Sequence, residues 1–411
     1  MDVPTFLDLA DAQKRLIEEV TATSAIIDVP LEAALGCVVA SDVAAPIDIP
    51  HFDNSAMDGY ALLHDDPALA TERPQLAVIG ESFAGHPYSG IVSPGQCVRI
   101  FTGARIPEGA SAVVMQEDTT LLGDRQVRFD ARPSAQHHIR HRGSDVRLGQ
   151  RLFARGIRLT PAHLGLVASA GITSVSCYEH PRIGLFTNGD EIVMPGKPLG
   201  PGDIYDSNHH FLAAALRALP IEVVDLGHVR DDVRALENAI QTGLRDCDAI
   251  LSSGGVSVGE ADLVGDVLAR LGEVAFWKVA MKPGKPLLFG HLGNTPFFGL
   301  PGNPVSTVVT FLQLVRPAFE KMCGLNPTSP WSIKATLRSA IDKSPGRLDF
   351  QRGIMSFDQD GSVTVESTGD QSSAILSSVV QANCLIVLPR EQGNLLEGAG
   401  VRVQPYAQFG L

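Results

Sequence analysis

From residue 182 onward, apolar strand-like runs alternate with amphipathic helix-like runs, and few folds accommodate such an order. The alternation predicts a mainly parallel sheet with helices on both faces. Ligands of such folds bind at the carboxyl ends of the strands, where loops meet helix N-termini. The three successive pairs are "RIGLFTNG" with "SNHHFLAAALRALP", "IEVVDLG" with "DDVRALENAIQTGLRD", and "DAILSSGG" with "EADLVGDVLARLG".

The segments on either side of this region have other patterns. Residues 5–21 place apolar side chains on one helical face, and 304–322 predicts a second long helix. From 46 to 144, short strand-like runs separated by Gly and Pro predict a mostly β module, followed by a well-capped helix at 160–171. After a linker at 324–330, short strands return and predict a β-barrel or sandwich of about 80 residues.

Composition restricts the classes of function. A chain of 411 residues predicts several domains. The net charge of −13 argues against non-specific binding to nucleic acid or to an anionic membrane surface. No apolar run approaches the roughly 18 residues of a membrane span, and the acidic N-terminal segment does not resemble a signal peptide, so we expect a cytoplasmic protein. The six cysteines are widely spaced and predict neither a zinc site nor a disulfide framework.

A glycine-rich loop, "SSGGVSVGEADL" (252–263), follows the third predicted strand. It lacks the lysine of a P-loop and the spacing of a dinucleotide-binding fingerprint. Its backbone amides suit phosphate or a pterin-type ring, and Glu260 and Asp262 suit a hard cation such as Mg²⁺. The alternative is a plain glycine turn before an acidic helix start.

Lysines gather one strand further along the chain. Three of the eight lysines, Lys278, Lys282 and Lys285, fall within "WKVAMKPGKP". Ammonium groups there suit phosphate or another oxyanion, and an exposed edge with solvated lysines is the alternative. The following "GLPGNPVSTVVTF" predicts a turn before a helix, with Ser306 available to an anion.

Carboxylates recur in two further loops. Asp53 and Asp58 lie in "PHFDNSAMDGYAL", and Asp190 and Glu191 follow the first strand of the α/β region. Such acids suit a metal ion or an amine-bearing ring, although Asx-rich turns have the same composition. A basic stretch at 137–142 suits either an acidic partner surface or a solvated turn.

Taken together, these motifs resemble the molybdopterin molybdenumtransferase (MoeA) family, which includes the E domains of gephyrin and of the plant cofactor-synthesis protein. The resemblance covers nearly the whole chain, because seven motifs share one order and one spacing. They are "FDNSAMDGYA", "FTGARIPEGASAVV", "IRHRGSDV", "DIYDSN", "SSGGVSVGEAD", "WKVAMKPGKP" and "GLPGNPVS".

The resemblance implies a multidomain α/β plus β fold and an elongated homodimer. Domain I is discontinuous (1–45 and 145–178), and a β-rich domain II (46–144) is inserted in it. Domain III (179–326) is a central three-layer α/β molybdopterin-binding unit, and domain IV (327–411) is a C-terminal β-barrel.

The implied reaction is the last step of molybdenum cofactor synthesis. Adenylylated molybdopterin and molybdate are the substrates, and AMP leaves with the help of Mg²⁺. Carboxylates of Glu191 and Asp262 would hold Mg²⁺. The phosphoanhydride and molybdate would be bound by Gly254, Gly255, Ser257, Lys278, Lys282 and Lys285, with Arg352 and Ser373 from the C-terminal domain.

Further site residues follow from the resemblance motif by motif: Asp58, Thr102, Asp145, Asp231, Pro301, Pro304 and Ser306. In a homodimer, Asp58 and Thr102 of the inserted domain are able to complete the partner subunit's site. "FTNGDEIV" departs from the family at Asn188, which leaves the roles of Asp190 and Glu191 open. No residue resembles a nucleophile with a paired base, so we expect electrostatic and metal-assisted catalysis. Transient partners would be other cofactor-synthesis proteins and apo-molybdoenzymes.

Two other functions stay open at this stage. The adenylyltransferase that makes the adenylylated pterin shares the α/β domain, but it is a single small domain whose loop is usually GGTG-like. A non-catalytic, gephyrin-like scaffold would have lost acids or lysines that this chain retains. The sequence does not separate molybdate from tungstate.

Overall fold

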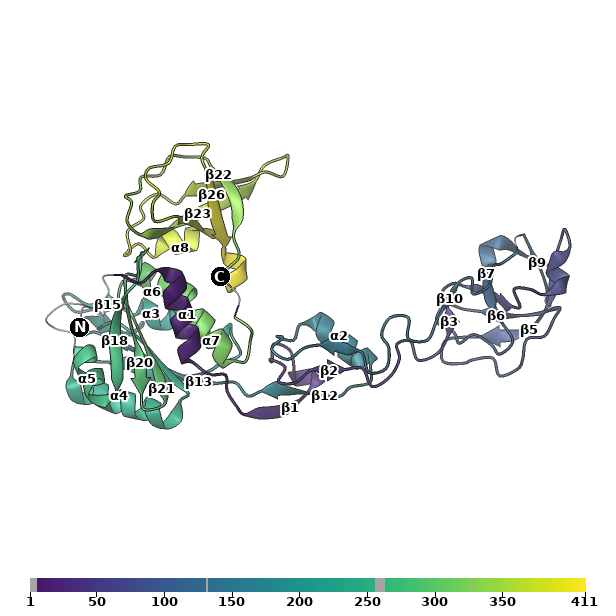
Figure 1. Ribbon diagram of the computed structural model, residues 1–411, viewed down its shortest axis with the longest axis horizontal. Helices are drawn as coiled ribbons and strands as arrows, with labels where there is room; N and C mark the ends of the chain where they lie inside the picture. Colours follow the sequence, from purple (N-terminus) through teal and green to yellow (C-terminus); the bar gives the residue numbers. More distant parts are fainter. Residues whose placement is uncertain (1–5, 131, 256–262, 328) are drawn as a thin grey trace.

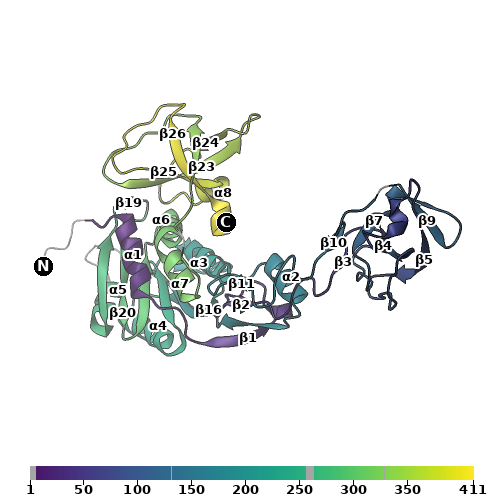
Figure 2. The ribbon, with the colours of Figure 1, turned by 45° about the vertical axis from the view of Figure 1, so that its right-hand side comes forward.

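The computed structural model describes residues 6–130, 132–255, 263–327 and 329–411. The molecule is elongated, with an α/β unit and a barrel at one end and a β-rich module at the other (Figure 1). A small unit lies between them, and a second view shows the same separation (Figure 2). Every helix in the described part of the chain is too short or too polar to cross a membrane.

The α/β unit is built on a six-stranded sheet with the order β16-β13-β17-β21-β20-β18. The first four of these strands are parallel, β20 is antiparallel to both of its neighbours, and β18 therefore runs in the direction of the first four, which confirms the predicted mainly parallel sheet. The strands are β13 (Arg182–Asn188), β16 (Glu222–Val229), β17 (Ala249–Ser253), β18 (Glu273–Lys278), β20 (Pro286–Leu292) and β21 (Thr295–Leu300).

Helices cover both faces of this sheet. One face carries α1 (Leu9–Glu19), α3 (Ser207–Arg217), α6 (Pro304–Thr310) and α7 (Arg316–Met322). The other carries α4 (Val233–Asp246) and α5 (Leu263–Leu271). Two helices begin where an aspartate side chain accepts a backbone N–H, at Asp206 before α3 and at Asp232 before α4.

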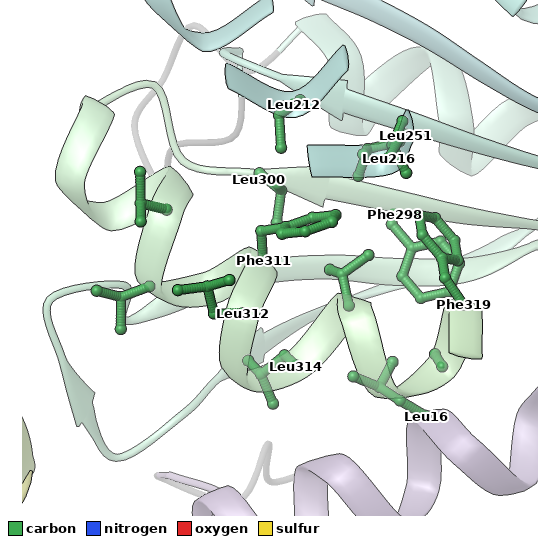
Figure 3. Packing of buried hydrophobic residues seen from close by; sticks show 14 of the residues in the cluster. Leu16, Leu212, Leu216, Leu251, Phe298, Leu300, Phe311, Leu312, Leu314 and Phe319 are labelled. Atoms are coloured by element: carbon green, nitrogen blue, oxygen red, sulfur yellow. The ribbon is translucent and has the colours of Figure 1, made fainter. Parts of the chain in front are cut away.

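The core of the α/β unit is aromatic at its centre. Phe298 on β21 and Phe319 on α7 pack edge to face, with ring centroids 5.0 Å apart (Figure 3). Both side chains have 0% of their surface exposed. They join the helical layer to the sheet.

Replacing Phe319 with alanine is expected to lower the unfolding free energy of the α/β unit by about 3–5 kcal/mol, because a full ring is removed from a closed core. Urea denaturation followed by Trp277 fluorescence measures this loss. The matched variant Phe357→Ala removes a ring that is 68% exposed and should change stability by about 0.5 kcal/mol or less. Similar losses in both variants would contradict the assignment of Phe319 to the core.

The helix predicted at 304–322 forms, but it contains a π-helical segment, η4 (Phe311–Val315), between α6 and α7. The reason is Pro317, which has no N–H to donate to the carbonyl of Gln313 one turn earlier. That carbonyl accepts instead from Gln13 Nε2 at 2.7 Å. A side chain of helix α1 thereby supplies the donor that the Gln313 carbonyl lacks because of the proline.

The small central unit is formed by two segments far apart in sequence. Strand β1 (Ile26–Pro30) pairs antiparallel with β12 (Ser174–Tyr178), and β2 (Val43–Ala44) pairs with β11 (Arg151–Phe153). The predicted capped helix, α2 (Pro161–Ser169), packs on these strands.

The β-rich module is inserted in this unit, between β2 and β11. It holds a six-stranded sheet with the order β7-β4-β6-β5-β9-β8. Its strands are β4 (Gly59–Leu62), β5 (Gln75–Ser82), β6 (Gln96–Ile100), β7 (Ala112–Met115), β8 (Thr119–Leu121) and β9 (Gln126–Phe129). At its base, β3 (Asn54–Ser55) pairs with β10 (Ile139–Arg140).

The C-terminal region is a closed five-stranded barrel, which decides between the barrel and the sandwich left open by the sequence. A short strand of the lysine-rich stretch, β19 (Met281–Lys282), adds in parallel to β23, so the lysines lie where barrel and α/β unit meet. The barrel strands are β22 (Ile333–Leu337), β23 (Leu348–Phe357), β24 (Val363–Ser367), β25 (Cys384–Leu388) and β26 (Gly400–Pro405), with α8 (Ser377–Gln381) against β23.

Candidate functional site

A cavity of about 700 Å³ opens beyond the carboxyl ends of β13, β17 and β21. This is the edge of the sheet at which the sequence predicts ligand binding. The predicted site residues that line the cavity are Glu191, Asp231, Gly254, Gly255, Lys278, Lys285, Pro301, Pro304 and Ser306. The walls therefore combine a glycine turn, carboxylates and ammonium groups.

The glycine turn after β17 has no room for a side chain. A Cβ on Gly254 would lie 2.1 Å from the backbone oxygen of Asn188, and one on Gly255 would lie 2.2 Å from Asn188 Oδ1. Both glycines have positive φ angles, +95° and +64°. The turn therefore packs closely against the end of β13, and because both of its glycines also line the cavity, no side chain of theirs blocks an anion. Ser257, Glu260 and Asp262, predicted in the same loop, lie outside the described residues.

Two acidic loops meet at another part of the cavity. The backbone N–H of Asp231 donates to Asp190 Oδ1 (3.2 Å), and the N–H of Asp190 donates to Asp231 Oδ2 (3.3 Å). Asp190 and Asp231 thus bind each other's loops, and all three acids are exposed, but only Glu191 and Asp231 line the cavity. Of the two acids that the sequence left open, Glu191 is the one that faces the ligand space.

The described acids suit Mg²⁺ as part of a ligand shell. Among the described residues no group of three or more His, Cys, Asp or Glu side chains is arranged to hold a metal ion alone. Mg²⁺ is usually held by one or two carboxylates together with water and substrate phosphates. Glu191 and Asp231 beside a phosphate-sized glycine turn fit that pattern.

A second cavity of about 610 Å³ lies between the lysine-rich loop and the barrel. The predicted residues Lys282 and Ser373 line it, together with Arg347, which sequence analysis missed. Lys285 and Ser306 line both cavities, so the two spaces adjoin. Three cationic side chains against one carboxylate, Asp370, make this space suitable for an oxyanion.

Arg352, predicted as an oxyanion ligand, lies behind the second cavity and is only 1% exposed. Its Nε donates to Ser378 Oγ (3.0 Å) and its Nη2 to the carbonyl of Ser372 (3.1 Å). Burial lowers the pKa of the guanidinium below its usual value. In this structure Arg352 holds the loop that carries Ser373.

Asp58, Thr102 and Asp145 are not brought to either cavity within one chain. Asp58 and Thr102 lie in the β-rich module at the far end of the molecule, and Asp145 is exposed in its connection to the central unit (Figure 1). Asp58 Oδ1 accepts from the hydroxyl (2.7 Å) and the backbone N–H (2.8 Å) of Thr102. These bonds, led by the hydroxyl, lower the pKa of Asp58.

Replacing Thr102 with valine is expected to raise the pKa of Asp58 toward its ordinary value, without reaching it because the backbone bond remains. Since a lowered folded-state pKa stabilises the fold above the unfolded-state pKa, the variant should lose less stability than wild type as pH falls through the folded pKa. Carbon-detected NMR titration of Asp58 measures the shift. An unchanged titration would show that the hydroxyl does not act on the carboxylate.

Sequence analysis missed several residues that shape the main cavity. Asp206 is 2% exposed and accepts from the Thr187 hydroxyl and from the backbone N–H of His209, and Asn208 lies beside it in the lining. The motif "DIYDSN" contains both and was the available signal. For Arg347, nothing in the local pattern pointed to a site.

Fold and site together define a multidomain α/β protein with a cavity at the sheet edge that suits an anionic ligand, next to a space with a cationic lining beside a β-barrel. Three family models match successive parts of the chain. They are the MoeA N-terminal region (domain I and II) at residues 7–171, the probable molybdopterin binding domain at 184–321, and the MoeA C-terminal region (domain IV) at 334–406. The chain belongs to the molybdopterin molybdenumtransferase family of transferases.

Full-length relatives agree with this assignment. The chain is 42% identical to the molybdopterin molybdenumtransferase of Haemophilus influenzae, over 97% of this chain and 98% of that protein. It is 37% identical to molybdopterin molybdenumtransferase 2 of Mycobacterium tuberculosis, over 95% and 97%. A crystal structure of the molybdopterin biosynthesis MoeA protein from Pyrococcus horikoshii superposes with a TM-score of 0.82 at 30% identity, covering 98% of this chain and 99% of that one.

Proposed function

We propose that this chain transfers molybdenum from molybdate into the dithiolene of adenylylated molybdopterin, with Mg²⁺-dependent release of AMP. The observation that carries the proposal is the pair of adjoining cavities. One combines a bare glycine turn with carboxylates, and the other is lined by cationic side chains. A phosphoanhydride next to an oxyanion requires this combination.

The main cavity would hold the pterin nucleotide. Backbone groups at Gly254 and Gly255 would approach its phosphates, while Lys278 and Lys285 would balance their charge. Glu191 and Asp231, together with Asp262, would hold Mg²⁺. When bound there, the ion stabilises negative charge on the departing adenylate. The protein itself would hold the phosphates among charged groups that are in place before the reaction begins.

The second cavity would hold molybdate as a substrate. Lys282 and Lys285 offer ammonium groups and Ser373 a hydroxyl, and Lys282 Nζ lies 4.0 Å from Asp349 Oδ2. Arg347 adds a guanidinium to this set. Arg352 would act by holding the Ser372 carbonyl and thereby the loop that offers Ser373.

We also propose that the working unit is a cytoplasmic homodimer with domain limits near residues 45, 144, 178 and 326. The pairing of β1 with β12 supports a discontinuous first domain. The distance of Asp58, Thr102 and Asp145 from the cavities of their own chain supports a role at a partner subunit's site (Figure 1). Transient contacts would hand substrate in from cofactor-synthesis proteins and cofactor on to apo-molybdoenzymes.

The test is an assay of the purified protein with adenylylated molybdopterin, Mg²⁺ and molybdate. AMP release that requires both molybdate and Mg²⁺, with a product that reconstitutes an apo-molybdoenzyme, is the expected result. Substrate binding without AMP release would favour a scaffold. AMP transfer from ATP to molybdopterin would favour an adenylyltransferase. A tungstate arm measures the preference between the two oxyanions.

A further inference from the structure

A hydrogen-bond network holds the turn at 301–303, which forms one wall of the main cavity. Thr307 Oγ1 donates to the carbonyl of Pro301 at 2.6 Å and lies 3.1 Å from that of Asn303. Ser253 Oγ also donates to the Pro301 carbonyl, at 3.1 Å. Asn208 Nδ2 donates to the carbonyl of Gly302 (2.8 Å) and to Ser253 Oγ (3.0 Å). The Pro301 carbonyl is thus held in the protein interior by two buried bonds, and the Gly302 carbonyl is held by Asn208 at the cavity wall.

The direction of these carbonyls fixes the direction of the amides that follow them. In a trans peptide the C=O and the next N–H point in opposite directions, and the peptide bonds after Pro301 and Gly302 are trans. The N–H groups of Gly302 and Asn303 therefore point away from the network. Both residues line the main cavity, and neither N–H has a hydrogen-bond partner within the described part of the chain.

A separate observation indicates a ligand at the same wall. Ser306 is 6% exposed and lines both cavities, yet its hydroxyl has no partner among the residues described. A hydroxyl that lines both cavities and has no protein partner is free to bind a ligand oxygen. Lys285 lines the same two spaces, and its ammonium group favours an anionic ligand atom there.

We propose that Asn208, Ser253 and Thr307 are positioning residues that hold the 301–303 turn so that its two amides and the Ser306 hydroxyl bind an anionic oxygen of the substrate's phosphates. The proposal rests on the proposed function, because it names the groups that receive the phosphoanhydride. Thr307 is 0% exposed, so it acts through the turn and does not touch the substrate.

Inorganic pyrophosphate is the probe, and its affinity for the full chain is measured by calorimetry. Thr307→Val keeps the side-chain shape but removes the donor, and we expect about tenfold weaker binding. Thr307→Ser keeps the hydroxyl and should restore the wild-type affinity. Thr310→Val is the matched control, because Thr310 is also 0% exposed on α6 and its hydroxyl has no partner among the described residues. It should bind pyrophosphate within about twofold of wild type.

In turnover, Thr307→Val should raise KM for the adenylylated substrate about tenfold and change kcat little, because the lost contact orients bound phosphate. Wild-type affinity for pyrophosphate in Thr307→Val, equal losses in Thr307→Val and Thr310→Val, or no binding of pyrophosphate by the wild type would each overturn the inference. Pyrophosphate binding requires neither pterin nor molybdate. A specific loss in Thr307→Val together with absent AMP release would therefore uphold this network while rejecting the proposed reaction.

Discussion

Gly254→Ala is expected to reduce molybdate-dependent AMP release at least 100-fold. The added Cβ would lie 2.1 Å from the backbone oxygen of Asn188, and a backbone atom cannot rotate away. Asn188 is the last residue of β13, and its side-chain amide donates to the carbonyl of Val229 on β16 at 3.1 Å, so the sheet resists the shift. The turn itself must move, and a displacement of about 1 Å in a positioning element costs about 100-fold in rate.

The control for this variant is Gly293→Ala, in the turn between β20 and β21. Gly293 also has a positive φ angle, +63°, but nothing lies within 4 Å of an added Cβ. It should lose about 1 kcal/mol of stability and keep its turnover. Calorimetry with AMP and thermal unfolding separate the two effects. Wild-type AMP affinity in Gly254→Ala would show that the turn does not approach the ligand.

The second large effect is expected for Glu191→Gln. Removing the charge from a carboxylate that faces the cavity should weaken Mg²⁺ binding and lower turnover about 100-fold, since a metal ion supplies several kcal/mol of charge stabilisation. The measurement is AMP release as a function of Mg²⁺ concentration. High Mg²⁺ should recover part of the rate if the loss is one of affinity.

Asp190→Asn is the companion variant, because it removes the neighbouring charge. Asp190 accepts the N–H of Asp231, and an amide oxygen is able to accept the same bond. We expect a small change in rate and no change in Mg²⁺ dependence. The reverse ranking of the two variants would assign the metal to Asp190 and refute the reading of the cavity.

The fold of the α/β unit was predictable because its elements carry strong local signals. Asp206 and Asp232 cap helices just before apolar periodic stretches, and the parallel strands are continuous apolar runs. The π-helical segment was not predictable in the same way, although Pro317 is its cause. Whether a proline kinks a helix or is absorbed depends on a partner such as Gln13, which lies 300 residues away in sequence.

The site residues that lie at the ends of strands were predictable from the sequence. Those whose position depends on tertiary packing were not. Gly254, Glu191 and Lys278 come directly after strands or at their ends, so the parallel sheet brings them together. Arg352 has an equally promising sequence context, yet it is buried, because α8 and the Ser372 loop cover the outer face of its barrel strand. No local pattern around Arg352 predicts that these later segments cover it.

The place of α1 has a consequence for the synthesis of the chain. Gln13 and Leu16 pack against a helical layer whose residues lie about 300 positions later. At roughly 5–20 residues per second, a ribosome needs about 15–60 s to deliver that layer. Throughout this interval the apolar stripe of α1 has no native surface to cover it. The nascent chain therefore exposes the apolar face of this helix long before the α/β unit is complete.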